Sequence, residues 1–279
     1  MYKWLCMAAI LGLSGCQYHH VAPSTLVDQG DFMLLTANKS KAVNQRIRFL
    51  VLHYTAADFP TSLALLTGDK VSAHYFIPAI PAVYPDSGKP VVWQLVPETL
   101  RAWHAGVSSW GKSTNLNDSS VGIEQENEGF TETVSGVRWY PYTSAQIDLV
   151  VALAKQIVQR YQIEAVNIVG HSDIAPLRKM DPGPLFPWKT LADAGIGAWP
   201  NANTVTTLLA ARAKDQPVAI APLLAKLARY GYGVTPEMTP EEQRRVIAAF
   251  QMHFRPADIR GKPDAETAAI IDALLVKYY

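Results

Sequence analysis

The chain has 279 residues, of which 49% are hydrophobic and 18% charged, and its 25 basic and 24 acidic side chains leave a net charge of +1. This length can bury one sizeable core and a small second domain, and the composition is typical of a globular protein. The balanced charge shows neither the basic footprint of a nucleic-acid-binding protein nor the field that an acidic partner would need, so we expect no nucleic-acid partner.

The first residues have the layout of an export signal. Lys3 precedes an apolar run at residues 4–13, and small residues and the polar stretch QYHH follow. Signal peptides have this layout, whereas a membrane-spanning helix needs about 20 apolar residues. An ordinary cleaved signal is one interpretation. However, the tetrapeptide LSGC, which ends at Cys16, resembles a bacterial lipobox.

The lipobox resemblance implies that residues 1–15 are a lipoprotein signal peptide and that Cys16 carries the lipid, palmitate included. Gln17 resembles the residue found at that position in lipoproteins that are sorted onward to the outer membrane. We therefore expect a lipid-anchored protein of the outer membrane that faces the periplasm. Cys6 would be lost with the signal, so the mature chain would have no disulfide despite an oxidising compartment.

Residues 16–44 are expected to form a tether and lead-in, because their polar, mixed sequence has no sustained period. The segment RIRFLVLHY follows, and its near-continuous apolar run is typical of a central strand covered on both faces. This strand would deliver His53 to its end. Further strands are predicted at residues 74–77, 91–96 and 121–125.

A helix is predicted at residues 143–161, where apolar residues recur at helical spacing and where Thr143 and Gln146 match a capping box. Strands and helices alternate over this part of the chain. The alternation predicts an α/β domain at residues 45–200, with a mixed central β-sheet flanked by helices.

Residues 168–170 predict another strand, which would place His171 at its end. Four prolines and a glycine follow between Pro176 and Pro187, and they are expected to exclude regular structure until Trp188. This stiff loop also carries Lys179 and Asp181. A stiff loop can hold metal ligands in place with little ordering entropy left to lose.

The C-terminal part changes character. Residues 201–217 are predicted to be a linker, and residues 218–279 a small domain of three short helices. The first helix would end at Gly231, the second would begin at the cap Thr239, and the third would follow Asp264. Three helices of this size are marginal alone, which favours docking on the larger domain.

Two histidines and one aspartate, His53, His171 and Asp181, are candidates for a metal site. Two neutral imidazoles and a carboxylate would hold Zn²⁺ and leave one position for water, as in catalytic zinc sites, and no thiolate remains in the mature chain. Spacing alone leaves an alternative open. In it the histidines make only structural hydrogen bonds, and Asp181, before a proline, only caps a turn.

Glu124 and Lys179 are candidates for the chemistry beside such a metal. Glu124 ends a predicted strand, where a carboxylate can be held rigidly and accept a proton from water, although a solvated strand end is the alternative. Glu126 is the weaker candidate. Lys179 can stabilise an oxyanion, although a loop lysine is normally solvated. Asp173 is the candidate for orienting the loop.

Trp103, His104, His74 and Asn127 are candidates for substrate binding. The segment RAWHAG puts Trp103 and His104 in a loop, where the indole can stack on sugar or peptide. Packing of Trp103 in the core, with His104 as its hydrogen-bonding neighbour, is an equal alternative. His74 lies on a predicted strand, which allows burial instead. His253 belongs to the C-terminal helices and is expected to lie away from the chemistry.

In this order and combination, the segments LVLHYTA, SAHYFI, RAWHAG, VGIEQEN and GHSDIAPLRKMDPGPLFPW resemble the type-2 zinc N-acetylmuramoyl-L-alanine amidases. This family also includes phage lysozyme-amidases and animal peptidoglycan-recognition proteins, and the resemblance extends over residues 46–200. It implies that His53, His171 and Asp181 bind zinc, that Glu124 accepts the proton of water, and that Lys179 stabilises the transition state.

The implied reaction is hydrolysis of the amide bond between the lactyl group of N-acetylmuramic acid, including its 1,6-anhydro form, and L-alanine of the stem peptide. Peptidoglycan and muropeptides are the implied partners. Phage enzymes have a catalytic Tyr where this chain has Ala73 and a Cys ligand where it has Asp181. Glu124 must then take the catalytic role of this Tyr. The Asp ligand does not weaken the zinc assignment, because another branch of the family shares it.

The C-terminal helices resemble a peptidoglycan-binding domain, and simple packing on the catalytic domain is the alternative.

A second hypothesis for the whole chain is a non-catalytic wall-binding module. Members of the fold that only bind lack the third ligand, so Asp181, Glu124 and Lys179 argue against this hypothesis. A third hypothesis is that the enzyme acts only on 1,6-anhydro-muropeptides during recycling. Recycling amidases are usually cytosolic, and the export signal favours wider access to intact wall.

Overall fold

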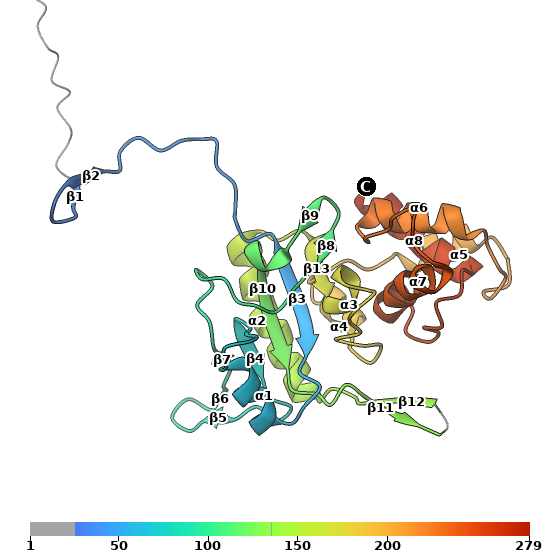
Figure 1. The fold of residues 1–279 in the computed structure, drawn as a ribbon, viewed down its shortest axis with the longest axis horizontal. Coiled ribbons are helices and arrows are strands. Elements are labelled where there is room, and N and C mark those ends of the chain that lie inside the picture. Colours follow the sequence, from blue (N-terminus) through green and yellow to red (C-terminus); the bar gives the residue numbers. More distant parts are fainter. Residues whose placement is uncertain (1–25, 135) are drawn as a thin grey trace, which may run out of the picture. The chain divides into compact units, whose positions relative to one another are not determined.

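The computed structural model describes residues 26–134 and 136–279 and separates into two compact units, residues 1–44 and 45–279 (Figure 1). The predicted signal peptide and Cys16 lie outside the described residues. In the first unit, β1 (Leu26–Asp28) and β2 (Met33–Leu35) form an antiparallel hairpin, so the predicted tether contains one short ordered element. Within the described ranges, no helix has the length and apolarity needed to cross a membrane.

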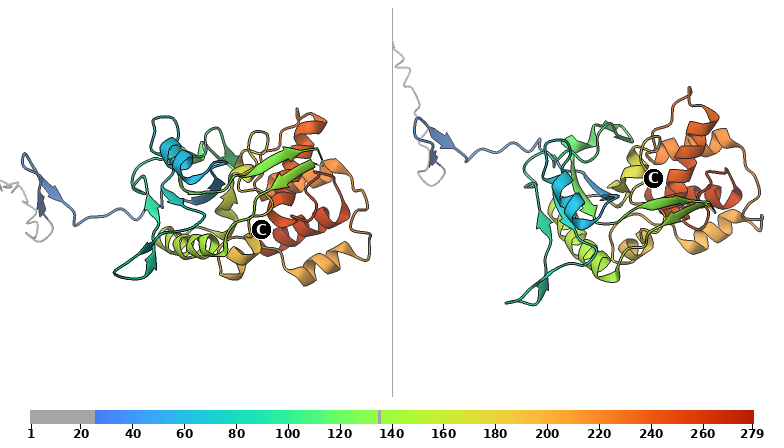
Figure 2. Two further views of the ribbon diagram at one scale, coloured as in Figure 1. Left: turned by 90° about the horizontal axis from the view of Figure 1, so that it is seen from below. Right: turned by 60° about the horizontal axis from the view of Figure 1, so that its bottom comes forward.

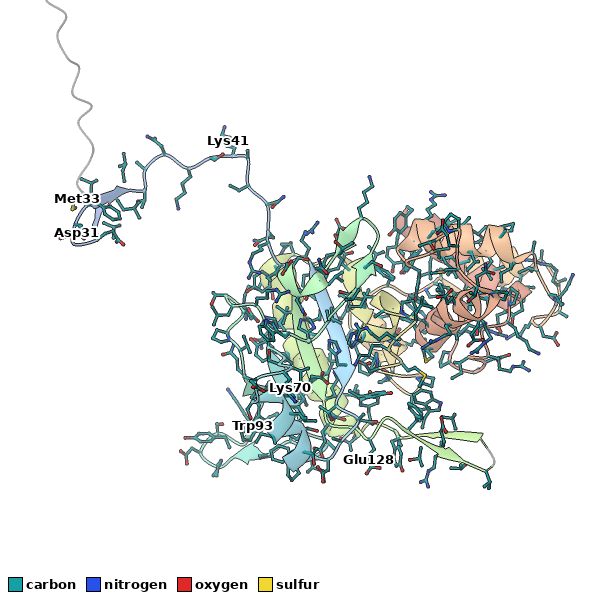
Figure 3. All side chains as sticks on the ribbon, viewed as in Figure 1. Asp31, Met33, Lys41, Lys70, Trp93 and Glu128 are labelled. Carbon is teal, nitrogen blue, oxygen red and sulfur yellow. The ribbon has the colours of Figure 1, made fainter. Side chains whose placement is uncertain are left out.

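The second unit is built on a five-stranded mixed sheet with the order β13-β3-β10-β4-β7. Four strands are parallel, namely β13 (Ile168–Gly170), β3 (Phe49–Tyr54), β10 (Ser120–Gln125) and β4 (Tyr75–Ile77). The edge strand β7 (Trp93–Gln94) pairs antiparallel with β4. The predicted mixed sheet is confirmed, although the strand expected at residues 91–96 is shorter. Trp93 on this edge is partly exposed, and its ring contacts Phe59 (Figure 3).

Both faces of the sheet are covered, as the continuous apolar run of β3 requires. Leu50 and Leu52 belong to the core cluster that α2 (Ser144–Tyr161) closes on one face. On the other face, Phe76 packs against α1 (Phe59–Leu66), and Figure 2 shows α1 and α2 on opposite sides of the sheet. Phe49, Val51 and Val169 belong to a second large cluster, which they share with the C-terminal helices.

The N-terminus of α2 confirms the predicted helix start and corrects its detail. The Thr143 hydroxyl accepts a hydrogen bond from the Gln146 backbone N–H, as an N-cap does. The Gln146 side chain does not return to Thr143. It is buried and donates to the carbonyl of Ile77, which also accepts from Glu126 N–H, and to the carbonyl of Glu126, which directly follows β10. The helix is thereby fastened to the sheet.

Short elements connect these parts of the catalytic domain. They are the hairpins β5 (Val83–Tyr84) with β6 (Lys89–Pro90), β8 (Ser109–Trp110) with β9 (Ser113–Thr114), and β11 (Phe130–Thr133) with β12 (Gly136–Trp139), the 3-10 turns η2 (Leu116–Asp118) and η3 (Ala165–Asn167), and the helices α3 (His171–Ile174) and α4 (Trp188–Asp193).

The C-terminal part contains the three predicted helices, α6 (Ile220–Tyr230), α7 (Pro240–Phe254) and α8 (Ala265–Tyr278). Thr239 and Glu242 form the expected capping box of α7, and Asp264 caps α8. The predicted linker contains a further helix, α5 (Ala202–Leu209), which packs on α8. Because the buried residues of α6, α7 and α8 share one cluster with a face of the sheet, docking on the larger domain is confirmed.

A buried carboxylate joins the C-terminal end of α2 to the sheet. Glu98 is 9% exposed and accepts hydrogen bonds from Tyr75 (2.7 Å), Arg160 (2.6 Å) and Tyr161 (2.7 Å). Burial alone would raise the pKa of Glu98, but the hydrogen bonds from Tyr161, Tyr75 and Arg160 outweigh burial and lower it. The ionised form is therefore the one that stabilises the fold.

We expect Glu98→Gln to reduce the free energy of unfolding by about 1–3 kcal/mol at pH 7, because an amide cannot accept from all these donors. The folded-state pKa is depressed, so this stabilisation is present above the unfolded pKa of about 4.3 and is lost as pH falls through the folded value. Urea unfolding at pH 7 and at pH 3 measures the effect. An equal difference between variant and wild type at both pH values would contradict it.

Candidate active site

The C-terminal ends of three neighbouring parallel strands meet at one edge of the sheet. His53 near the end of β3 lies in register with Glu124 of β10, and β13 leads directly into α3, which begins at His171. In open α/β sheets, ligands bind outside this edge, where loops from several strands converge. The topology therefore brings His53 and His171 together although 118 positions separate them.

Helix α3 is a single turn, so the prediction of no regular structure before Trp188 is wrong for His171–Ile174. The prolines act only from Pro176 onward, where they end the helix. The Asp173 carboxylate accepts the backbone N–H of Gly170 at 2.7 Å, and Ser172 N–H donates to the carbonyl of Asp181 at 2.8 Å. Asp173 thus orients this segment, as the sequence suggested.

His53, His171 and Asp181 converge on one point. His53 Nδ1 lies 3.0 Å from His171 Nδ1, and Asp181 Oδ2 lies 3.0 Å from each of these nitrogens. The three side chains are buried, with residue exposures of 0%, 3% and 6%. Ligands at 2.0–2.1 Å from a tetrahedral zinc ion lie about 3.3 Å apart, so this donor set fits one small cation. The convergence that the sequence predicted is present.

The hydrogen bonds of His171 free its inner nitrogen for a metal. The carbonyl oxygen of Ala105, which can only accept, lies 3.0 Å from His171 Nε2, and the Arg178 guanidinium, which can only donate, lies further away at 3.3 Å, so the nearer partner places the ring proton on Nε2. Arg178 donates to the same carbonyl at 2.8 Å and to the carbonyl of Val107 at 2.9 Å. In the neutral ring, Nδ1 then carries a lone pair that faces His53 and Asp181.

A chain of four groups sets the tautomer of His53 in the same way. Ser120 donates its hydroxyl proton to the carbonyl of Leu116 at 2.6 Å, so its oxygen accepts from His104 Nε2 at 3.2 Å. His104 Nδ1 must then accept from His53 Nε2 at 3.0 Å. The Nδ1 atom of neutral His53 is left unprotonated. Partners of this kind orient metal-binding histidines and raise their basicity.

The electrostatics favour the protonation states that metal ligands need. Burial, followed by the charge of His171, lowers the pKa of His53 to about 4. Burial alone would raise the pKa of Asp181, but the charges of and hydrogen bonds from His171 and His53 outweigh burial and lower it. At neutral pH the pocket therefore offers neutral His53 and ionised Asp181.

We expect Ser120→Ala to weaken zinc binding about 10- to 100-fold, the usual effect of losing a group that orients a metal-binding histidine. Without the hydroxyl, the buried Nε2–H of His104 loses its acceptor and the ring no longer fixes His53. His104 is seated closely, since a Cβ at Gly122 would lie 2.5 Å from its Cγ atom. Competition with a chromophoric chelator measures the affinity. Wild-type affinity in the variant would contradict the orienting role of this chain.

Glu124 has the environment of a general base. It lines the same cavity as His171 and Asp181, and among the described residues its Oε2 atom has no hydrogen-bond partner although it is buried. Burial, and secondarily the charge of Asp181, raises its pKa well above the usual value, while Lys179 opposes this shift. A carboxylate with a raised pKa and an open acceptor can take up a proton near neutral pH. The solvated strand end is therefore excluded.

Lys179 and Trp103 line this cavity as well. No ion pair holds the ammonium of Lys179 within residues 26–134 and 136–279, so it can interact with a bound ligand. Trp103 is 53% exposed, which excludes the alternative that its ring packs in the core. An exposed indole on the cavity rim fits the predicted stacking on substrate.

The other predicted substrate-binding residues are buried. His104 lies behind His53 and orients it, as described above. His74 accepts from Gly122 N–H at 3.0 Å and contacts the carbonyl of Leu100 at 3.3 Å, and it is 0% exposed. Asn127 bonds to the backbone of Gly129, Tyr140 and Pro141. Contacts of these three residues with substrate stay predictions, and burial does not favour them for His74 and Asn127, whereas His104 also lines the cavity.

Some relevant residues were missed or misplaced by sequence reasoning. Ser120 and Arg178 received no role, although Arg178 is adjacent to Lys179 in a segment already singled out. His253 was expected to lie away from the chemistry. Instead its Nδ1 atom lies 2.7 Å from the carboxylate of Asp173, two residues after a predicted metal ligand. Nothing local in the sequence of α7 indicated this contact, because it joins residues 80 positions apart.

Comparison with known proteins agrees with this geometry. A family model described as N-acetylmuramoyl-L-alanine amidase matches residues 43–184. The N-acetylmuramoyl-L-alanine amidase AmiD of Escherichia coli is 54% identical over 278 residues, which cover 99% of this chain and 98% of that protein.

Two solved structures have the same fold over most of the chain. One is the E. coli AmiD complex with the substrate anhydro-N-acetylmuramic acid-L-Ala-D-gamma-Glu-L-Lys, with a TM-score of 0.88, 54% identity, and 91% of this chain and 98% of that one covered. The other is AmpDh3 of Pseudomonas aeruginosa in complex with an anhydromuramic pentapeptide, with a TM-score of 0.78, 41% identity and coverages of 90% and 98%. The chain therefore belongs to the N-acetylmuramoyl-L-alanine amidase family.

Proposed function

We propose that this protein is a zinc-dependent N-acetylmuramoyl-L-alanine amidase. It hydrolyses the amide bond between the lactyl group of N-acetylmuramic acid, including 1,6-anhydro forms, and L-alanine of the stem peptide. Family membership supports the reaction, and the two related structures that hold anhydromuramyl peptides support the substrate class. His53, His171 and Asp181 would hold the zinc ion.

The chain's own residues account for the proton transfers. Zinc at this site supplies polarisation of the scissile carbonyl and lowers the pKa of a water to about 7. Glu124 accepts the proton of the attacking water and passes it to the leaving amine of L-alanine. The Lys179 ammonium stabilises the negative charge that develops on the carbonyl oxygen. Trp103 offers a face on which the substrate can stack.

One observation carries the proposal. Glu124, a half-buried carboxylate with a raised pKa and one buried oxygen that has no partner among the described residues, lines the same cavity as a metal-binding donor set whose nitrogen lone pairs point inward. A module that only binds peptidoglycan has no use for a general base. The retained Asp181, Glu124 and Lys179 therefore favour catalysis over the alternative of a non-catalytic recognition module.

We expect Lys179→Ala to lower kcat about 10²- to 10³-fold, the typical effect of losing one oxyanion donor, with a smaller change in KM. Lys189→Ala is the matched control, because Lys189 is exposed and pairs with Asp193 on α4. Steady-state kinetics on a defined muropeptide distinguish the two variants. Equal kcat values in the Lys179 variant and the wild type would contradict the role of Lys179.

The proposed reaction is tested with the full chain purified in detergent. The protein is incubated with defined muropeptides, with reducing-end and 1,6-anhydro-muramic acid, in the presence and absence of a chelator, and products are identified by mass. Peptides that begin with L-alanine are expected, and chelation should abolish their release. Cleaved glycan or shortened peptides would show that the reaction class is wrong. Activity on the anhydro form alone would support the narrower recycling substrate.

We further propose that Cys16 carries a lipid that anchors the protein in the outer membrane, facing the periplasm, where peptidoglycan is within reach. The lipobox-like LSGC and Gln17 after the cysteine support this proposal. Metabolic labelling with palmitate and fractionation of the membranes test it, with Cys16→Ser as the comparison. An unlabelled wild-type chain, or one that fractionates with soluble proteins, would overturn it.

A further inference from the structure

Asp173 is a buried charge that the proposed reaction does not use. Its side chain is 0% exposed, and it carries three hydrogen bonds, from Gly170 N–H (2.7 Å), the Tyr232 hydroxyl (2.6 Å) and His253 Nδ1 (2.7 Å). A carboxylate removed from water needs such donors to remain stable. Asp173 lies on α3, two residues after His171, so its position and that of the ligand are linked by one turn of helix.

Two of these three donors belong to the C-terminal helical domain, defined here as residues 218–279. Tyr232 follows the end of α6, and His253 lies on α7. The catalytic domain itself supplies only a backbone N–H. The charge on α3 is therefore stabilised mainly by side chains from a domain for which the sequence suggested peptidoglycan binding or simple packing.

His253 also contacts the chain segment that follows Asp181, another of the proposed metal ligands. Its ring stacks on Trp188, with 3.7 Å between the ring centroids and 15° between the planes. Trp188 begins α4, directly after the loop that carries Asp181. The His253 imidazole thus contacts both chain segments that follow the proposed metal ligands. It contacts one segment through Asp173 and the other through its stack on Trp188.

Helix α3 cannot hold its shape alone. A turn of four residues forms too few hydrogen bonds to offset the entropy of ordering it, so tertiary contacts must fix it. Figure 1 shows α3 between the sheet and α7, and α3 contacts β3, β13 and α7. Ile174 belongs to the same buried cluster as Val246 and Phe250 of α7. The polar and apolar contacts of α3 therefore both lead into the C-terminal helical domain.

We propose that the C-terminal helical domain is a positioning component of the metal centre, acting through the hydrogen bonds of Tyr232 and His253 to Asp173. The domain would then be required for full activity on small, soluble muropeptides, for which attachment to the wall gives no advantage. This inference rests on the proposed zinc site. Tyr232 and His253 are positioning residues, since neither lines the cavity that holds Glu124 and Lys179.

Tyr232→Phe in the full chain, purified in detergent, tests the proposal. It removes the hydroxyl and keeps the ring that packs on Trp110. We expect about 10-fold weaker zinc affinity in competition with a chromophoric chelator, as for the loss of other groups that orient metal ligands, and an altered visible absorption spectrum of the cobalt-substituted protein. Tyr278→Phe is the matched control, because the Tyr278 hydroxyl accepts from Trp199 N–H at 3.1 Å, between the same domains but away from α3.

A second measurement separates positioning from general loss of stability. If Tyr232 acts through Asp173, the effects of Tyr232→Phe and Asp173→Asn on zinc affinity are non-additive in a double-mutant cycle. Wild-type affinity and cobalt spectrum in Tyr232→Phe, with only a lower Tm, would show that the domain merely packs and would overturn the inference. Additive effects would overturn the route through Asp173. A wild-type chain that fails to bind zinc would overturn the proposed function as well.

Discussion

Glu124→Gln is expected to lower kcat on muropeptides by roughly 10²- to 10⁴-fold while bound zinc stays at the wild-type level. Glutamine keeps the size of the side chain but cannot accept the proton of the attacking water or return it to the leaving amine. Zinc should remain, because Glu124 is not part of the converging donor set formed by His53, His171 and Asp181. Kinetics and metal analysis on the same preparation measure both quantities.

Glu126→Gln is the matched control for this substitution. Glu126 lies two residues further along, and its carboxylate accepts from the backbone N–H of Ala79 at 2.8 Å, outside the cavity that Glu124 lines. We expect near wild-type kcat in this variant. If Glu124→Gln retained full activity, or if both variants lost it equally, Glu124 would not be the base.

The pH profile gives an independent test of the same residue. Burial raises the pKa of Glu124, and the base must be ionised to work, so kcat/KM should fall as pH drops through that raised value. The residual activity of Glu124→Gln should lack this acidic limb. An unchanged limb in the variant would assign the titration to another group.

Asp181→Asn is expected to weaken zinc binding at least about 100-fold, more than the loss of a group that only orients a ligand, and to abolish activity at ordinary zinc concentrations. The amide removes the single negative charge that faces two buried imidazoles at 3.0 Å. Because a metal that binds only the folded state stabilises it, the variant should also lose the rise in Tm that zinc produces in the wild type.

Chelation of the wild type should reproduce the loss of activity, and added zinc should restore it, whereas added zinc at the same concentration should not rescue Asp181→Asn. Asp193→Asn is the control, since Asp193 is exposed and pairs with Lys189 on α4. Metal content, Tm and activity are measured for all three proteins. Full activity of Asp181→Asn without bound metal would rule out the proposed metal centre.

Much of this site follows from local patterns in the sequence. The apolar run that leads to His53 is long enough to indicate a buried strand, and the shorter runs that lead to Glu124 and Gly170 fit neighbouring strands of one sheet, which deliver their last residues to one edge. The apolar residues that recur at helical spacing over residues 144–161 predict α2 in the same way. These features depend on neighbours in sequence, so a single sequence contains them, and the family resemblance adds the roles of the residues.

Such sequence patterns do not predict short helices and strands. The single turn of α3, the hairpin of β1 and β2 and the two-residue strands are too short to repeat a period, so only their tertiary surroundings define them. The Gln146 side chain shows the same effect, because the carbonyls of Ile77 at the end of β4 and of Glu126 just after β10 compete successfully for the amide that the capping box would use.

The sequence patterns predicted the α/β domain and the C-terminal helices, and the family resemblance supplied the roles of His53, His171 and Asp181. The tertiary contacts show which nitrogen of His53 faces His171 and Asp181, which oxygen of Glu124 lacks a partner among the described residues, and that His253 of α7 contacts Asp173. These features are contacts between chain segments far apart in sequence. Their partners are selected by the packing of whole elements, and no local period or propensity encodes that packing.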